Sequence, residues 1–183
     1  HGRGQIVDTP CKTCDGKGKI RRQKTIEISV PAGIDDDQIL NVGGKGNAGS
    51  NGGPNGDLHV YITVRPHAIF TRRGNDVWCD MPITFTQAAL GAEVTVPTLD
   101  GKVSYTVHEG TQPGDVFKLK GKGIQNINGR GRGDQYVRVT VEVPKNLSKR
   151  QKELLQEFEQ NADEKNYQKR KSFFGKIKGM FED

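Results

Sequence analysis

An internal repeat is the feature of this sequence that most restricts how the chain can fold. Residues 28–46 align without a gap with residues 105–123, at an offset of 105 − 28 = 77 positions. The same offset places residues 56–64 on residues 133–141. One fold has therefore been used twice in tandem.

Each copy of the repeat has the pattern of β-strands. Apolar and polar residues alternate over 26–30 and over 58–64, which is the period of a half-buried strand. Gly33 closes the first of these strands, and the glycine-rich stretch 43–56 is typical of a long loop between strands. The second copy repeats this pattern and adds further elements, which we predict as strands over 77–85, 93–96 and 102–107 and a short helical turn over 87–90.

The pattern changes after Pro144, where helical signals replace strand signals. Residues 148–151 have the form of a capping box with Ser148 as N-cap. Four apolar residues accompany this helix at helical spacing: Leu147, Leu154, Leu155 and Phe158. A lone helix of about three turns is marginal in water unless its apolar stripe is buried. It must therefore dock, either on its own second copy or on a partner chain.

We predict an all-β fold class, with two tandem small β-sandwich-like domains followed by a C-terminal α-helix. A composition of 32% hydrophobic residues with 24 glycines favours many turns and modest cores. The tail beyond the helix is charged, is expected to be mobile, and ends in a stretch compatible with a weak amphipathic segment. The predicted boundaries are 1–22 for a cysteine-containing region, 23–76 for the first copy, 77–146 for the second copy, and 147–183 for the helix and tail.

Two cysteines two residues apart, Cys11 and Cys14, make half of a tetrahedral zinc site, because structural zinc takes four thiolate or imidazole ligands. The chain offers no second pair, since Cys79 lies in a strand pattern, where a small buried hydrophobe is expected, and the four histidines stand alone. A redox pair is the alternative, but the glycines after Cys14 favour a tight turn over the helix N-terminus that redox cysteines usually occupy. We therefore favour metal over redox chemistry.

Charge and motif searches argue against several classes of function. The formal net charge is +6, and residues 1–24 carry seven Lys/Arg against two Asp, or 7 − 2 = +5. A basic zinc module could bind nucleic acid, but aromatic platforms for bases are absent there, so a solvated surface is favoured. Residues 44–49 fit G-x-G-x-x-G without a following helix, and no Walker A sequence occurs. We predict no enzyme and no specific nucleic-acid partner.

The sequence also gives no sign of a membrane or secretory segment. No apolar run of about 18 residues occurs, so no membrane partner is expected, and the start of the chain has no signal-peptide pattern. The first residue is His1 rather than methionine, and the chain is expected to be a fragment of a longer protein.

The stretch Cys11-Lys-Thr-Cys14-Asp-Gly-Lys-Gly18 resembles the C-x-x-C-x-G-x-G repeat of the DnaJ family of co-chaperones. Residues 1–4 resemble the tail of a preceding repeat. The resemblance extends over essentially the whole chain and indicates the bacterial form with a zinc-binding region; it is carried further by residues 30–33, 56–58, 67–70, 89–91 and 96–101.

This resemblance implies a division of labour along the full protein. An N-terminal J domain with a His-Pro-Asp motif, absent here, would stimulate the DnaK-type ATPase chaperone. Four cysteine repeats would form two zinc centres, the first repeat pairing with the fourth and the second with the third. Cys11 and Cys14 match the fourth repeat, so zinc is expected to be absent or incomplete in this chain. The family resemblance also implies a cytoplasmic location and a part in the stress response.

The resemblance also implies that the two β-rich domains bind unfolded polypeptides and that the C-terminal helix holds a homodimer. The predicted dimer-interface residues are Leu147, Leu154, Leu155 and Phe158. An extended client can add a strand to a sheet edge while an apolar pocket takes its side chains. The family resemblance places Phe70 in that pocket, although the opening strands of the first domain are expected to be missing from this chain. The candidate peptide-binding residues are Phe70, Ile26, Ile28, Val30, Leu40, Val60 and Ile62.

Overall fold

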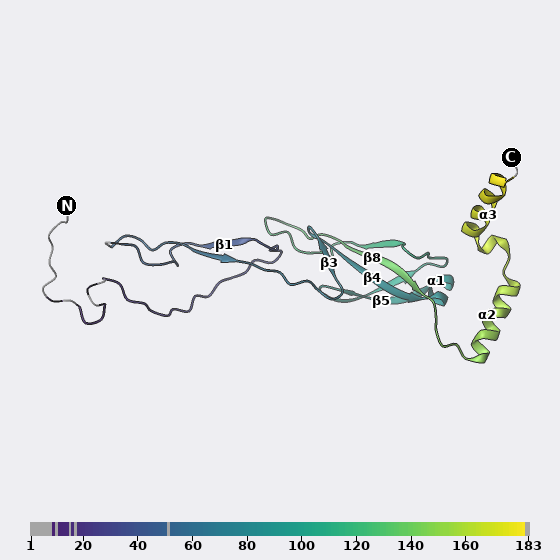
Figure 1. Cartoon of the computed structure of the whole chain (residues 1–183), viewed down its shortest axis with the longest axis horizontal. Coiled ribbons are helices and arrows are strands. Elements are labelled where there is room, and N and C mark those ends of the chain that lie inside the picture. The colour runs from purple at the N-terminus through teal and green to yellow at the C-terminus, as the bar shows by residue number, and fades with distance from the viewer. Residues whose placement is uncertain (1–8, 10, 15, 17, 51, 182–183) are drawn as a thin grey trace.

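The computed structural model describes residues 9, 11–14, 16, 18–50 and 52–181. Its elements lie along one long axis, with the first copy towards the N-terminus, the larger sheets of the second copy next to it, and the helices at the C-terminal end (Figure 1). Strands in several sheets form most of the regular structure before residue 148, which confirms the all-β fold class with C-terminal helices. Within the residues described, no helix is long and apolar enough to cross a membrane.

The first copy forms a two-stranded antiparallel hairpin, β1 (Ile39–Val42) and β2 (Leu58–Tyr61). Their long connection is closed by its own backbone, because the Gly46 N–H donates to the Gly56 carbonyl at 2.7 Å. The Asp57 carboxylate accepts from the Gly44 N–H at 2.9 Å, which lowers the pKa of Asp57. These bonds fix the register of β1 and β2 across a glycine-rich loop.

The second copy is built around a four-stranded sheet in the order β3-β4-β8-β7, in which β4 and β8 are parallel. A separate antiparallel hairpin, β5-β6, follows the short helix α1, whose N-cap Thr84 forms a capping box with Gln87. The bounds are β3 (Thr71–Arg73), β4 (Asp76–Thr84), α1 (Phe85–Leu90), β5 (Ala92–Thr98), β6 (Gly101–Val107), β7 (Val116–Leu119) and β8 (Gln135–Glu142).

The hydrophobic core lies entirely in the second copy. Alternate residues of β4 point inward, and they meet the central residues of β8 and of the β5-β6 hairpin. Among the described residues, the first buried one along the chain is Val77. The core cluster consists of Cys79, Met81, Ile83, Ala88, Val96, Val107, Val137 and Val139. Cys79 is thus a small buried hydrophobe, as predicted, and burial raises the pKa of its thiol.

The tandem repeat is confirmed at the level of single hydrogen bonds. At the offset of 77, β1 corresponds to β7 and β2 to the first half of β8, with the same pairing register. The second copy repeats the loop closure, because the Gly123 N–H donates to the Gly133 carbonyl at 2.8 Å. Likewise the Asp134 carboxylate accepts from the Gly121 N–H at 2.7 Å. Gly44 and Gly121 both take positive φ angles, 65° and 67°.

The predicted strand over residues 26–30 is wrong, since this segment has no regular secondary structure. Its counterpart in the second copy lies in β6, which pairs with β5. The counterpart of β5 would be residues 15–21, where Gly16 and Gly18 have φ angles of 75° and 69° that an extended strand does not use. The segment therefore lacks the pairing partner that β6 has.

The predicted boundary between residues 76 and 77 divides strands of one sheet, because β3 pairs with β4. The sheet of the second copy thus includes β3. Arg72 on β3 also ties the two copies together: its guanidinium donates to the carbonyls of Gly33 and Ile34 at 2.9 and 2.7 Å and lies 3.3 Å from Asp35. These two hydrogen bonds and the ion pair, which we call the Arg72 clamp, therefore hold the first copy to the sheet of the second.

The C-terminal region is helical. The predicted capping box is confirmed, with Ser148 capping α2 (Lys149–Asn161). The segment expected to be a mobile tail contains the 3-10 helix η1 (Glu164–Asn166) and the helix α3 (Gln168–Phe181).

Candidate functional site

The first copy presents an apolar sheet face that has little cover. On the β1-β2 hairpin, Leu40 pairs with Val60 and Val42 pairs with Leu58, and all four side chains are half-buried. We call these four residues the hairpin face. Leu40 and Val60 were predicted site residues, whereas Val42 and Leu58 were missed. The alternation of the strand sequence, read two residues along from each predicted position, would have found both.

The edges of this hairpin are also open. Among the described residues, β1 pairs only with β2, so each strand has one edge whose backbone groups are unpaired. Ile62 continues β2 beyond its end and is held by backbone bonds, donating to the Gln38 carbonyl at 2.9 Å and accepting from Asp37 at 3.1 Å. An apolar face beside an unpaired strand edge is the arrangement that an extended peptide can join.

The corresponding surface in the second copy is covered by its own strands. At the offset of 77, Leu40, Val60 and Ile62 correspond to Phe117, Val137 and Val139. Val137 and Val139 are fully buried, and Phe117 packs against the core cluster and stacks on Tyr105 with ring centroids 3.7 Å apart. Val60 and Ile62 are therefore half-buried where their counterparts are core, whereas Leu40 and Phe117 are both half-buried.

A groove of about 270 Å³ remains between β6 and β7 of the second copy. Its lining residues are Tyr105, Val107, His108, Thr111, Asp115, Val116, Phe117 and Val139. The equivalent positions in the first copy are Ile28, Val30, Pro31, Ile34, Gln38, Ile39, Leu40 and Ile62. Four of these, Ile28, Val30, Leu40 and Ile62, are predicted peptide-binding residues, so they occupy the positions that line a groove in the second copy.

The remaining candidates lie outside the hairpin. Ile26 and Ile28 are half-buried and Val30 is exposed, all within the irregular segment before β1. Phe70 lies just before β3, where it packs against the core cluster of the second copy and its ring centroid lies 5.0 Å from that of His67. The structure thus associates Phe70 with the junction of the two copies.

The cysteine pair forms a tight turn in which the Cys14 N–H donates to the Cys11 carbonyl at 3.2 Å. Hydrogen bonds from the backbone of Thr13 and Cys14 lower the pKa of the Cys11 thiol. Backbone donors at the sulfur and a thiolate-favouring environment fit a zinc ligand pair. Among the described residues, no group of three or more His, Cys, Asp or Glu side chains could hold a metal ion.

The apolar stripe of α2 has little cover. Leu154, Leu155 and Phe158 are exposed and Leu147 is half-buried, while the edge of the Phe158 ring meets Phe85 of α1 with centroids 6.2 Å apart. No residue of α2 is buried. Docking on the chain's own second copy is therefore limited to one aromatic contact, and most of the stripe stays available to a partner.

Comparison with known proteins decides the family. Residues 5–144 match the family model described as DnaJ C terminal domain, and residues 150–183 match the model described as Chaperone protein DnaJ C-terminal region. The chain belongs to the DnaJ C-terminal domain family. The resemblance seen in the sequence is thus confirmed, and membership of this family supports a chaperone role.

The chain is similar to several proteins named Chaperone protein DnaJ. It is 58% identical over 180 residues to the one from Ruminiclostridium cellulolyticum, covering 98% of this chain and 48% of that protein. The one from Acetivibrio thermocellus is 53% identical over 178 residues, covering 97% and 46%. The one from Desulfitobacterium hafniense (strain DCB-2) is 51% identical over 183 residues, covering 100% and 48%. The chain therefore spans about half the length of the curated relatives it matches.

Proposed function

We propose that this chain is the client-binding part of a co-chaperone, which binds non-native polypeptides and prevents their aggregation without an enzymatic activity of its own. The observation that carries this proposal is the contrast between equivalent positions: Val60 and Ile62 remain accessible where Val137 and Val139 are buried. Contiguous apolar surface that is accessible to water is one mark of an interaction site.

The binding mode follows from the open strand edge. A client in extended conformation gains main-chain hydrogen bonds along β1 or β2, while its alternate side chains reach the hairpin face. Main-chain bonds do not depend on the client sequence, and a shallow apolar face discriminates little among aliphatic and aromatic side chains. The site should therefore bind many unfolded sequences weakly.

Dimerisation would make such weak sites effective. We propose that the exposed stripe of α2, with Leu154, Leu155 and Phe158, packs against the same stripe of a second copy of the chain. Two sites on one dimer can hold one long client, so the second contact forms at a high effective concentration and strengthens binding without new contacts.

The full protein would have two further functions. We propose that a J domain delivers the client to a DnaK-type chaperone in the cytoplasm, and that Cys11 and Cys14 provide two thiolates of a structural zinc centre. When bound, zinc would supply cross-linking of the cysteine region and no reaction chemistry.

The binding proposal is tested by replacing Val60 with aspartate. Val60→Asp places a charge on the hairpin face, and Tyr61→Asp is the matched control because Tyr61 is the next residue, points to the other face and is 75% exposed. Fluorescence anisotropy with a labelled apolar peptide should show at least about tenfold weaker binding for Val60→Asp, because a charge on an apolar contact surface is costly to desolvate. Tyr61→Asp should bind as the original chain does. Equal affinities of all three would refute the site.

The dimer proposal is tested on α2 by sedimentation. Leu154→Glu places a charge in the stripe and should give monomers, as should deletion of residues 147–183. Gln156→Glu is the control, because Gln156 lies about 200° around the helix from Leu154 and outside the stripe. Dimers that survive the Leu154→Glu substitution would place the interface elsewhere.

A further inference from the structure

The helix α3 has an unusual charge distribution for a chain that contains 22 acidic residues. Residues 165–181 include six Lys/Arg and no Asp or Glu. The same stretch holds several large apolar residues, of which Phe173, Phe174 and Met180 are 60%, 56% and 77% exposed. A basic helix that leaves large apolar side chains exposed to water is a candidate for binding a partner.

The two kinds of residue are sorted around the helix. At about 100° per residue, Phe173, Phe174, Ile177 and Met180 fall within an arc of about 120°. Lys169 and Lys176 border this arc on one side and Lys171 borders it on the other. This arrangement is typical of a helix that lies in a membrane interface, with its apolar arc among the acyl chains and its lysines reaching out to the head groups.

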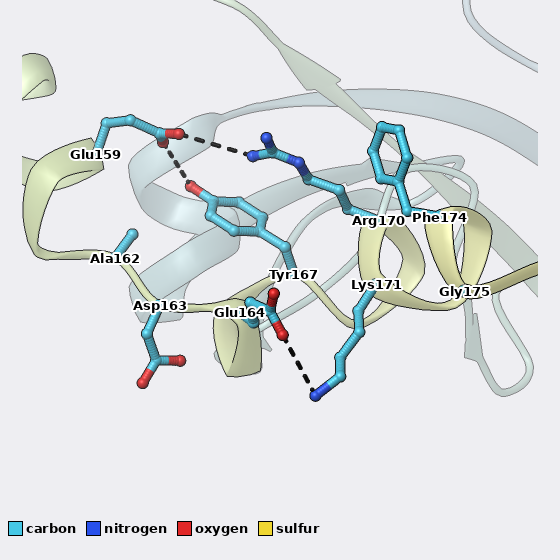
Figure 2. Close-up of a pocket in the computed structure, with 9 residues that line it drawn as sticks. All are labelled: Glu159, Ala162, Asp163, Glu164, Tyr167, Arg170, Lys171, Phe174 and Gly175. Carbon is cyan, nitrogen blue, oxygen red and sulfur yellow. Dashed lines mark hydrogen bonds and ion pairs between the residues drawn. The ribbon is translucent and has the colours of Figure 1, made fainter. Parts of the chain in front are cut away.

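Arg170 is the one cation that falls inside the arc, and it pairs with a residue of the preceding helix α2. Figure 2 shows Arg170 drawn towards Glu159 at the end of α2, at 3.8 Å, where Glu159 also accepts from the Tyr167 hydroxyl at 3.2 Å. Lys171 pairs with Glu164 of η1 at 3.4 Å. These contacts surround a cavity of about 610 Å³ that is lined by residues of α2, η1 and α3, among them Phe174.

We propose that α3 is an interfacial helix that binds the surface of an anionic lipid bilayer. The charge of α3 selects this partner: the helix is uniformly basic, its lysines border the apolar arc on both sides, and anionic head groups supply the complementary charge. The sequence-based expectation of no membrane partner rested on the lack of a spanning segment, and an interfacial helix needs no such segment. The proposal does not depend on client binding, because it involves neither the hairpin face nor a strand edge.

The test is co-sedimentation of the full chain with vesicles of phosphatidylcholine, with and without phosphatidylglycerol. We expect binding to the vesicles that contain phosphatidylglycerol, reduced at least about tenfold by Lys169→Glu/Lys176→Glu and by Phe173→Ser/Phe174→Ser, and weakened by added salt. Two matched controls should bind as the original chain does: Lys145→Glu/Lys149→Glu, with the same change in charge, and Leu90→Ser/Val143→Ser, with two exposed apolar residues of the second copy.

Other outcomes would overturn the proposal. Equal binding to both kinds of vesicle, no binding to either, or equal loss in the control variants would exclude an anionic surface recognised by α3. A lower mass of Phe173→Ser/Phe174→Ser in sedimentation without lipid would show that the arc instead packs against a second copy of the chain. The fluorescence of Trp78, the only tryptophan and part of β4, reports whether each variant remains folded.

Discussion

The two copies of the repeat share their loops but differ in what covers their sheets. Both close the loop between paired strands with the same glycine N–H bond, and both bind a glycine N–H with an aspartate, Asp57 or Asp134. Among the described residues, the second copy places β4 beside its paired strands and packs the β5-β6 hairpin against them, and the first copy shows no counterpart of these strands. The repeat itself therefore specifies a hairpin and its loop, whereas a hydrophobic core requires the added strands.

This difference also separates the roles of equivalent apolar residues. In the second copy they stabilise the fold, because removing apolar surface from water is the main favourable contribution to folding. In the first copy the same positions contribute less to stability and remain available for binding. A substitution in the second copy should therefore lower mainly the free energy of unfolding. The equivalent substitution in the first copy should lower mainly the affinity for peptide.

The largest expected effect comes from Val137→Asp. Val137 is fully buried between β4 and β7, so an unpaired charge there should lower the free energy of unfolding of the second copy by more than about 4 kcal/mol. Urea unfolding followed by Trp78 fluorescence measures this. Val60→Asp, the equivalent change in the first copy, should leave the Trp78 transition within about 0.5 kcal/mol of the original. A similar loss in both variants would mean that the copies share one core.

A second contrast lies in the loop glycines. An added Cβ at Gly133 would come within 2.0 Å of the Asn75 carbonyl oxygen, whereas at Gly56 the nearest atom would be 3.9 Å away. Gly133→Ala should therefore cost about 1–3 kcal/mol through overpacking against the β3-β4 turn. Gly56→Ala should stay within about 0.5 kcal/mol, since ordinary surface substitutions do. Thermal unfolding of both variants compares them directly. Equal midpoints would contradict the expected overpacking of Gly133→Ala against the Asn75 carbonyl.

The junction between the copies gives a smaller effect. Arg72→Gln removes the charged donor to the Gly33 and Ile34 carbonyls and the ion pair with Asp35. We expect a loss of about 1–2 kcal/mol in local opening, seen as faster amide hydrogen exchange around residues 33–38. The Trp78 transition should move little, because Arg72 lies outside the core cluster. Unchanged exchange would show that the clamp does not hold the first copy.

The smallest expected effect is a pH dependence shared by the two loops. The Gly44 and Gly121 N–H groups lower the pKa of Asp57 and Asp134 below the ordinary value. Each carboxylate therefore stabilises the fold above its ordinary pKa of about 3.9, and this stabilisation is lost as the pH falls through the lowered value. Asp134→Asn should flatten the acid limb of the Trp78 transition, and Asp57→Asn should leave it unchanged. Identical acid limbs in Asp134→Asn and the original chain would refute the loop bond.

The sequence predicts the second copy better than the first for a physical reason. The strands around Cys79, Val96 and Val107 have covered partners, so their alternating patterns and their structure agree to within about two residues. Residues 26–30 carry an equally clear alternation but lack a pairing partner, and alternation alone does not make a strand. The clamp of Arg72 and the position of Phe70 against the second core could not be predicted, because both depend on how the copies meet.

The candidate site was predicted in part. Leu40, Val60 and Ile62 come together on or beside one hairpin, as the pattern of alternation requires. The sequence could not predict which copy buries its apolar residues and which leaves them accessible. Equivalent positions carry similar apolar residues in both copies, and their burial depends on the strands that pack against them. The cysteine turn, in contrast, is a local motif, and the tight turn that the sequence favours there is present, closed by the bond from the Cys14 N–H to the Cys11 carbonyl.

Client binding is proposed at the surface of the first copy that lacks the cover seen in the second. Hydrogen exchange of the full chain, with and without a saturating apolar peptide, tests this proposal. We expect the peptide to slow exchange of amides in 39–42 and 58–62 and to leave exchange in the core strands β4 and β8 unchanged. Protection confined to the second copy, with no change over β1 and β2, would contradict it.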